Sequence, residues 1–249
     1  MIALGIDIGG SGIKGAPVDL ETGELTQERV RIETPQPSTP EAVARVTREV
    51  VESFDLPADT PVGITFPAPI KHNTVVFMAN LDQSWVGKNV DDVFEQELGR
   101  KVIALNDADA AGYAEAIYGA AKGHDGLVIV TTLGTGIGSA LIYNGQLIPG
   151  SELGHLEIDG VNAESRAAAR IREEEKLKFP EYAKRLQRYY SHVEMLFSPD
   201  LFVVGGGVSK KHDKFLPLLD LRTPIIPAQL RNTAGIVGAA ALAAKGEVL

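Results

Sequence analysis

Two glycine-rich turns, each preceded by an apolar run, are the first features of the chain that predict chemistry. Residues 9–12 (Gly-Gly-Ser-Gly) follow the apolar run 2–8, and residues 134–136 (Gly-Thr-Gly) follow the apolar run 127–133. Glycine lets several backbone N–H groups converge on one point, where they bind phosphate without a side-chain clash. A tight hairpin that needs positive φ would use the same glycines. The presence of two such turns in one chain favours phosphate binding.

Neither turn matches a common nucleotide motif. The G-x-x-x-x-G-K-[ST] pattern of the P-loop is absent from the chain. A strand rather than a helix is expected after the first turn, which argues against a Rossmann fingerprint. A third glycine run, residues 205–207, follows an apolar strand and would let a nucleotide or phosphate chain approach the backbone. The candidate phosphate-binding residues are Gly9, Gly10, Ser11, Gly12, Lys14, Gly134, Thr135, Gly136, Gly205, Gly206 and Gly207.

Asp7 lies just before the first glycine turn. A carboxylate beside a phosphate site repels the anion unless a cation lies between them, and Mg²⁺ held by carboxylates, water and phosphate oxygens meets that need. We therefore expect Asp7 to place Mg²⁺ through water. A capping or turn aspartate is the structural alternative.

Asn106 and Asp107 come where a predicted strand ends and a predicted helix begins. An aspartate here can accept the proton of an attacking hydroxyl group, as the base does in phosphoryl transfer, and Asn106 can hold the neighbouring hydroxyl. Asn and Asp are also ordinary helix N-caps, so a structural role stays open. Asp109 falls in the first helical turn and is expected to be structural.

Glu152 and His155 are three residues apart in a segment flanked by glycines. Such a pair can grip vicinal hydroxyl groups, one side chain accepting and the other donating hydrogen bonds. A metal site would need a third ligand that the sequence does not offer convincingly. An incidental pair in a loop is the alternative.

Lys210, Lys211 and Lys214 follow the third glycine run in a chain of net charge -9. They are expected to line a channel for a long anion, although a solvated helix face gives the same charge run. The negative net charge disfavours nonspecific binding to nucleic acid or anionic membrane.

Composition and the N-terminus predict a cytoplasmic globular protein. The 249 residues are 44% apolar and 23% charged, as in an ordinary globular protein. No cysteine is present, which excludes disulfides and cysteine-ligated metals and fits a reducing compartment. Residues 1–7 lack the basic segment of a signal peptide, and no apolar run approaches the length of a membrane span.

Strands and helices that alternate along the chain must position these residues. Thr39, Pro40 and Glu41 mark a helix start, with an N-cap, a first-position proline and an acidic residue. Residues 6–13 resemble residues 132–138, which indicates two lobes of similar topology. A charged helix before residue 197 places one apolar stripe on Tyr182, Leu186, Tyr189, Val193 and Leu196.

We therefore expect an α/β protein with two lobes. Residues 1–108 would form the N-terminal lobe with the first phosphate hairpin. Residues 109–249 would form the C-terminal lobe with the second hairpin and the Glu-x-x-His pair. The last helix, residues 233–244, belongs to the second range by position, and its packing against the N-terminal lobe stays open.

These motifs, in this order, resemble the ROK sugar kinases of the actin–hexokinase–Hsp70 ATPase superfamily, over essentially the whole chain. The resemblance implies an actin-like (ribonuclease H-like) ATPase fold with a cleft between two similar lobes. It implies that Asp107 is the general base and Asn106 a sugar ligand. Glu152 and His155 match the family's sugar-binding Glu-x-x-His pair.

Two further sugar-binding residues follow from the same resemblance. Asn80 belongs to a segment similar to the family's Asn-Leu…Trp segment near the sugar. Typical members carry a zinc motif rich in cysteine, which ends in a glutamate that touches the sugar. This chain has no cysteine and so no such zinc site, and Glu164 is expected to replace that glutamate.

A subgroup of actinobacterial ROK kinases also lacks the cysteine motif and has segments similar to residues 63–68, 132–141 and 152–157. This resemblance implies transfer of the terminal phosphoryl group of inorganic polyphosphate, and also of ATP, to the 6-hydroxyl of glucose. Some of these relatives also accept mannose. It further implies Mg²⁺ and a homodimer.

Three alternatives stay open within this family. They are an ATP-only hexokinase, a noncatalytic sugar-binding protein and a transcriptional regulator. The regulators carry an N-terminal helix-turn-helix, for which a hairpin that begins at residue 2 leaves no room. The charge is also wrong for DNA, so no nucleic-acid partner is expected.

Overall fold

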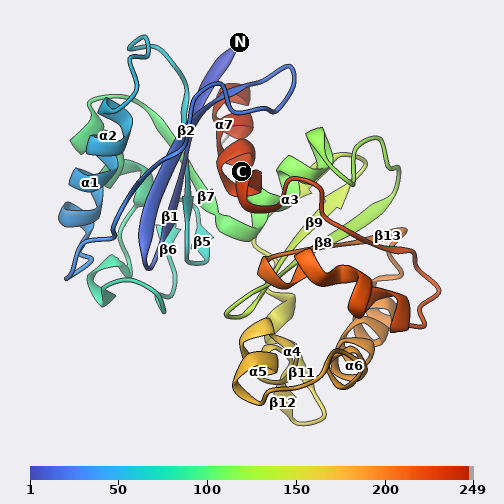
Figure 1. The fold of residues 1–249 in the computed structure, drawn as a ribbon. Coiled ribbons are helices and arrows are strands. Elements are labelled where there is room, and N and C mark those ends of the chain that lie inside the picture. The colour runs from blue at the N-terminus through green and yellow to red at the C-terminus, as the bar shows by residue number, and fades with distance from the viewer. Residues whose placement is uncertain (247–249) are drawn as a thin grey trace. The chain divides into compact units, whose positions relative to one another are not determined.

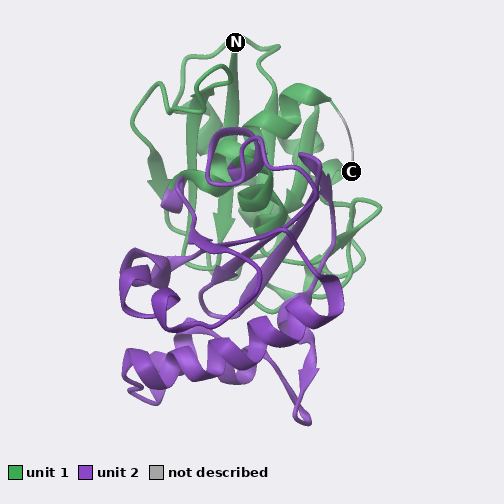
Figure 2. Cartoon of the chain, turned by 90° about the vertical axis from the view of Figure 1, so that its right-hand side faces the viewer, with its two compact units in different colours: residues 1–114, 233–249 green, residues 115–232 purple. Residues whose placement is uncertain are grey.

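The computed structural model describes residues 1–246, which belong to two compact units. Unit 1 consists of Met1–Ala114 and Thr233–Leu249, and unit 2 of Glu115–Asn232 (Figure 2). None of the helices in the described part of the chain is long and apolar enough to cross a membrane.

Unit 1 is built on a five-stranded sheet in the order β3-β2-β1-β4-β7 (Figure 1). On one side of β1, β2 pairs antiparallel with β1 and β3 pairs antiparallel with β2. On the other side, β4 and β7 run parallel to β1. Its elements in chain order are β1 (Ile2–Gly9), β2 (Gly12–Asp19), β3 (Val30–Ile32), α1 (Pro40–Glu52), β4 (Val62–Phe66), β5 (Ile70–Lys71), β6 (Thr74–Val75), the 3₁₀ helix η1 (Gln83–Trp85), α2 (Val90–Leu98), β7 (Val102–Asn106), α3 (Asp107–Tyr118), whose last residues belong to unit 2, and α7 (Ala234–Lys245).

Helix α1 begins where the sequence predicts. Thr39 Oγ1 accepts a hydrogen bond from the backbone N of Ala42 at 3.4 Å, and Pro40 is the first helical residue. The fully buried Val43 and Val50 lie on one face of the helix, seven residues apart. This spacing returns to the same side of a helix and packs α1 into the unit 1 core.

Helix α7 packs tightly against strands β1 and β4. A Cβ atom at Gly5 would collide with the carbonyl oxygen of Ile236, and one at Gly63 with that of Ala239. Only glycine at these two strand positions lets the helix backbone come so close. The helix is apolar on most of its surface, as a helix buried on several sides must be.

Unit 2 repeats the sheet topology of unit 1. Its five strands have the order β10-β9-β8-β13-β14, with antiparallel pairs on one side of β8 and parallel pairs on the other. The similar topology predicted from the internal repeat is therefore confirmed. The elements are β8 (Leu127–Leu133), β9 (Ile137–Tyr143), β10 (Gln146–Ile148), η2 (Leu153–His155), β11 (Glu157–Ile158), β12 (Val161–Asn162), α4 (Glu164–Ala167), α5 (Ala169–Glu174), α6 (Phe179–Phe197), β13 (Leu201–Gly205), η3 (Gly207–Lys214), η4 (Leu216–Leu218), β14 (Ile225–Pro227) and η5 (Arg231–Thr233).

Helix α6 supplies much of the unit 2 core. Tyr182, Leu186, Tyr189 and Val193 are buried, as their helical spacing predicts. Leu196 was expected on the same stripe but is 51% exposed. Leu196 is in the last turn of the helix, where Phe197 packs against the core instead.

Candidate active site

The first glycine turn closes the β1–β2 hairpin, with Gly9 paired to Gly12, so the predicted hairpin is confirmed. Arg31 of β3 donates from Nη2 to the Ser11 carbonyl oxygen at 2.8 Å, and Thr34 Oγ1 donates to the Gly9 carbonyl oxygen. These donors occupy carbonyl oxygens of the turn. The guanidinium group also adds positive charge beside the turn, where an anion is expected. The phosphate role of the turn stays a prediction.

Asn80 lies beside this same turn. A Cβ atom at Gly10 would be 3.2 Å from the Asn80 carbonyl oxygen, so the two backbones are in close contact. Asn80 is otherwise an exposed residue. The structure thus brings this predicted sugar-side residue next to the predicted phosphate residues of unit 1.

Asp7 is held by neighbours on both adjacent strands. Lys14 Nζ of β2 donates to Asp7 Oδ2 at 3.1 Å, and Thr65 Oγ1 of β4 donates to Asp7 Oδ1 at 2.9 Å. The Asp7 side chain is still 24% exposed, so its oxygens keep lone pairs for water. This donor set fits one Mg²⁺ ion held mainly by water and phosphate oxygens. Within residues 1–246, no cluster of three or more acidic, histidine or cysteine side chains could hold a metal.

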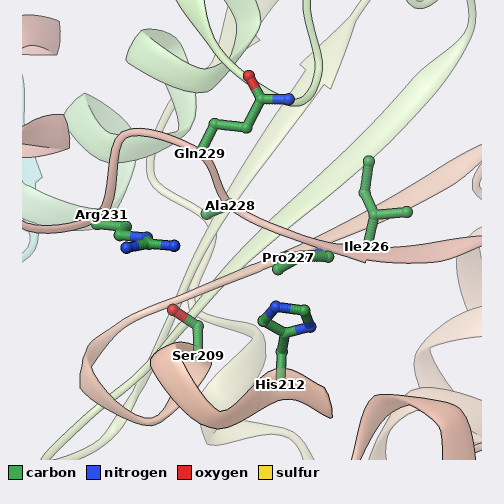
Figure 3. A pocket seen from close by; sticks show the side chains of 7 residues that line it. All are labelled: Ser209, His212, Ile226, Pro227, Ala228, Gln229 and Arg231. Carbon is green, nitrogen blue, oxygen red and sulfur yellow. The ribbon is translucent and has the colours of Figure 1, made fainter.

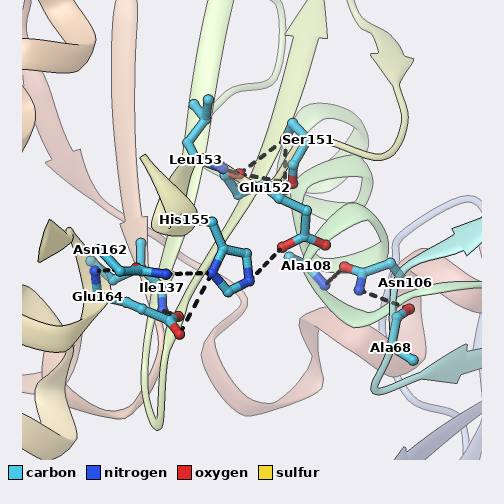
Figure 4. A network of polar contacts seen from close by, with 11 residues as sticks. Ala68, Asn106, Ala108, Ile137, Ser151, Glu152, Leu153, His155, Asn162 and Glu164 are labelled. Atoms are coloured by element: carbon cyan, nitrogen blue, oxygen red, sulfur yellow. Dashed lines mark hydrogen bonds and ion pairs between the residues drawn. The ribbon is translucent and has the colours of Figure 1, made fainter. Parts of the chain in front are cut away.

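Asn106 and Asp107 stand at the junction of β7 and α3. Asn106 Oδ1 accepts from the backbone N of Ala108 at 2.8 Å and of Asp109 at 3.4 Å (Figure 4). Its Nδ2 donates to the Ala68 carbonyl oxygen at 3.2 Å. Asn106 therefore caps the helix and keeps one amide hydrogen for a substrate hydroxyl. The cap fixes Asp107 as the exposed first residue of α3, while Asp109 is buried.

The second glycine turn closes the β8–β9 hairpin of unit 2. Within it, Gly134 N donates to the Gly136 carbonyl oxygen at 3.0 Å. Arg170 of α5 contacts the turn twice, through its backbone N to the Gly134 oxygen at 3.1 Å and through Nε to the Thr135 oxygen at 3.2 Å. An arginine thus contacts each glycine turn, since Arg31 does the same in unit 1.

Glu164 connects this turn with the predicted sugar pair. Its Oε2 accepts from the backbone N of Ile137 at 3.1 Å, and a Cβ atom at Gly136 would collide with the same oxygen. Its Oε1 lies 3.8 Å from His155 Nδ1. The residue expected to replace the family's glutamate is therefore in contact with both groups, as Figure 4 shows.

The orientation of the Asn162 amide selects one tautomer of the neutral His155 ring. Asn162 Oδ1 accepts from the backbone N of Glu164 at 3.2 Å, which turns the Asn162 amide nitrogen toward His155 Nδ1 at 2.9 Å (Figure 4). Nδ1 is then the acceptor, and the proton is on Nε2, 3.9 Å from Glu152 Oε2. Burial raises the pKa of Glu152, His155 opposes this rise, and Glu164 adds to it. The pair thus presents one donor and one acceptor, as two vicinal hydroxyl groups require.

The segment that carries Glu152 is anchored on β9. Ser139 Oγ accepts from the backbone N of Leu153 at 2.9 Å and donates to the Ser151 carbonyl oxygen at 3.0 Å. Ser139 is itself buried. These bonds fix the half-buried Glu152 directly before η2, rather than leaving it in an unsupported loop.

The third glycine run lies at the same sheet edge as the second turn. Strands β8, β13 and β14 are parallel, with Gly205 opposite Thr132 and Val204 opposite Pro227. Their carboxyl ends therefore meet at one edge, the usual place for a ligand in an α/β sheet. Gly206 has φ 82° and is the N-cap residue directly before η3. This edge brings together the residues predicted to bind phosphate in unit 2.

The three lysines predicted to line a channel are all exposed. Lys214 Nζ lies 5.8 Å from the centre of the Phe179 ring, so it is turned toward the start of α6. Lys210 and Lys211 are on the outer surface of η3. Their role toward a polyanion stays a prediction.

Arg31, Arg170 and Asn162 were missed by reasoning from the sequence. The two arginines contact turns that are 20 and 35 residues away in the chain, so no local pattern marks them. Asn162 precedes Glu164 by two residues, the spacing of an Asx turn, and that signal would have found it.

Comparison with known proteins identifies the family of this chain. The ROK family model matches residues 3–170, and the chain belongs to the ROK family. It is 53% identical to the polyphosphate glucokinase of Mycobacterium tuberculosis (strain ATCC 25618 / H37Rv) over 237 residues, 95% of this chain and 89% of the relative.

Solved structures give the same picture. The inorganic polyphosphate/ATP-glucomannokinase of Arthrobacter sp. strain KM has a TM-score of 0.93 and 55% identity, covering 99% of each chain. A ROK family glucokinase of Streptomyces griseus, in complex with glucose and AMPPNP, has a TM-score of 0.82 and 27% identity, covering 99% of this chain and 100% of that one. The predicted fold class, an α/β protein of the actin-like ATPase fold with two similar lobes, is confirmed.

Proposed function

We propose that this protein is a glucokinase that transfers the terminal phosphoryl group of inorganic polyphosphate, and also of ATP, to the 6-hydroxyl of glucose. The observation that carries this proposal is the contact of Glu164 with both the second glycine turn and His155. One carboxylate thereby joins a phosphate cradle to a hydroxyl-binding pair. The relatives from Mycobacterium tuberculosis and Arthrobacter support polyphosphate as the donor, and the second supports mannose as a further acceptor.

In this mechanism the sugar hydroxyls are bound by Asn106, Glu152, His155 and Glu164. Asp107 accepts the proton of the 6-hydroxyl as the sugar oxygen forms its bond to the terminal phosphorus. The bond from that phosphorus to the bridging oxygen breaks, and the shortened polyphosphate or ADP leaves. Positioning supplies most of the rate enhancement, because the protein forms no covalent bond in this transfer.

The donor is bound by the two glycine turns and the third glycine run. Their backbone N–H groups contact phosphate oxygens, and Arg31 and Arg170 add positive charge beside the turns. Asp7 would hold Mg²⁺ through water. When bound, the ion neutralises charge on the donor phosphates.

A cytoplasmic location and a homodimer are part of the same proposal. The absence of cysteine fits a reducing compartment. The homodimer follows from the resemblance to the polyphosphate-using kinases. Sedimentation equilibrium of the purified chain tests it.

A phosphoryl-transfer assay tests the function by crossing two donors, ATP and nucleotide-free polyphosphate, with two acceptors, glucose and mannose. We expect glucose 6-phosphate from polyphosphate without any nucleotide. The Asp107→Asn variant, purified in the same way, controls for contaminating kinases. Turnover with ATP alone would replace the proposal with an ATP-only hexokinase, and no turnover with either donor would leave a sugar-binding protein.

A further inference from the structure

Unit 2 has a pocket of about 340 Å³ that none of the predicted site residues lines. One wall comes from η3 and the other from β14 and the segment after it (Figure 3). The lining residues are Ser209, His212, Ile226, Pro227, Ala228, Gln229 and Arg231. The lining thus carries one arginine and one histidine and no carboxylate, in a chain of net charge -9.

Hydrogen bonds to β13 and to Glu115 hold the segment after β14 in place. The backbone N of Ala228 donates to the Val204 carbonyl oxygen at 2.9 Å. The carboxylate of Glu115, 1% exposed, accepts from the backbone N of Gln229 at 3.1 Å and of Leu230 at 2.7 Å. These bonds fix the backbone of residues 228–230, directly before Arg231. This wall of the pocket is therefore already formed without a ligand.

Arg231 has an unusual backbone for its residue type. Its φ is 49°, in the left-handed region that favours glycine. Strain of this kind persists where the surrounding structure imposes it, and it is common at ligand sites. In Figure 3 the Arg231 guanidinium group points into the space above Ser209, and the His212 ring lies on the other side of Ser209, below Pro227. Two N–H donors from separate elements thus face one pocket.

The pocket continues the edge where the donor is proposed to bind. Strands β8, β13 and β14 end there side by side, and they lead into residues 134–136, residues 205–207 and residues 228–231. Ser209 Oγ donates to the Gly206 carbonyl oxygen at 2.8 Å, so the wall of the pocket is joined directly to the third glycine run. A phosphate chain bound on the glycine runs would meet this pocket next.

We propose that Arg231 and His212 form a phosphate subsite that binds inner phosphate units of the polyphosphate donor. The inference rests on the proposed function, since it extends the same donor site. Arginine binds phosphate through a planar fork of N–H groups, and histidine adds a further donor. Phosphate groups of a nucleotide share this chemistry, but they end two units beyond the transferred group. A long chain reaches the pocket, and the subsite therefore favours polyphosphate over ATP.

Donor kinetics of the Arg231→Gln variant test this subsite. We expect the KM for polyphosphate to rise about tenfold, the loss of one charged hydrogen bond, while the KM for ATP changes by less than about twofold. Arg231→Gly is the second variant, because glycine accepts this φ and removes the guanidinium group without risk to folding. His212→Gln should raise the polyphosphate KM by a smaller factor. Lys184→Gln, which removes one exposed positive charge of unit 2 elsewhere, should change neither KM.

Direct binding separates the subsite from the function. Affinity for long-chain polyphosphate, measured by calorimetry without glucose on wild type and both Arg231 variants, should fall about tenfold in the variants whether or not polyphosphate supports turnover. A wild type that binds long-chain polyphosphate but gives no product from it would refute the proposed donor and leave the subsite standing. Unchanged polyphosphate KM and unchanged polyphosphate affinity in both variants, or an equal rise in the ATP KM, would overturn the subsite.

Discussion

Glu164 accepts a hydrogen bond from the backbone N of Ile137 at 3.1 Å, although the two residues are 27 positions apart in the chain. Ile137 is the first residue of β9, directly after the second glycine turn. The other carboxylate oxygen of Glu164 lies 3.8 Å from His155 Nδ1. One side chain therefore contacts both the turn and the pair that is predicted to bind the sugar.

Two substitutions at Glu164 separate these two contributions. Glu164→Gln keeps an oxygen that can accept from Ile137 N but loses the negative charge, so we expect the KM for glucose to rise about tenfold with little change in the donor KM. Glu164→Ala leaves the Ile137 N–H without its acceptor, and both KM values should rise. Steady-state kinetics with each substrate varied in turn measure this. Identical effects of the two variants would contradict a role in the turn.

Asn162 sets the tautomer of His155. Its amide nitrogen lies 2.9 Å from Nδ1, so wild type should carry the ring proton on Nε2 in long-range ¹H–¹⁵N spectra. Asn162→Leu removes the donor to Nδ1, and a mixture of tautomers should appear with a several-fold rise in the glucose KM, roughly the value of one hydrogen bond. A wild-type spectrum with the proton on Nδ1 would show that the assignment is wrong.

Asp107→Asn tests the base. The amide keeps the size of the side chain and the helix start but cannot accept a proton, so kcat should fall by roughly 10²–10⁴-fold. The dissociation constant for glucose, measured by calorimetry, should change far less, because the other sugar ligands remain. Near-normal turnover in this variant would exclude Asp107 as the general base.

Local patterns in the sequence were enough to predict the two hairpins. Each has an apolar strand, a glycine turn and a second strand in succession, and the pairing of Gly9 with Gly12 follows from that order. The repeat of this unit also predicted the matching sheet topologies. For Glu152 and His155 the spacing suggested a hydroxyl-binding pair but left an incidental loop pair open, and only the family resemblance pointed to a sugar.

Contacts between distant segments could not be predicted in this way. Glu115 accepts a hydrogen bond from the backbone N of Leu230, 115 positions away, and no local sequence pattern near either residue predicts this bond. The run that contains Lys210 and Lys211 shows a related limit. Charge alone does not tell which side of a helix faces a pocket, and the structure places His212 in the pocket lining.

Glu115→Gln should destabilise the protein strongly. The carboxylate, buried to 1% exposure, accepts from three backbone N–H groups, those of Ala120, Gln229 and Leu230. Glutamine has one oxygen, and its NH₂ group would face a backbone donor, so we expect the free energy of unfolding to fall by about 2–4 kcal/mol. Urea unfolding measures it. Glu173→Gln, the same change at an exposed position, should stay within about 0.5 kcal/mol of wild type.

Asp91 should make stability depend on pH in the acid range. Burial raises its pKa from 3.8 to about 6, with smaller contributions from Glu95 and Asp92 and an opposing one from its hydrogen bond with Ala104 N. A raised pKa in the folded state stabilises the protein fully below pH 3.8, and this contribution is lost as the pH rises through about 6. Asp91→Asn cannot titrate. The free energy of unfolding of the variant minus that of wild type should therefore increase from pH 3.8 to about pH 6, by at most about 3 kcal/mol. Urea unfolding of both proteins from pH 4 to pH 7 measures the difference. If the two curves run parallel over this range, the Asp91 carboxyl group is not the group that titrates.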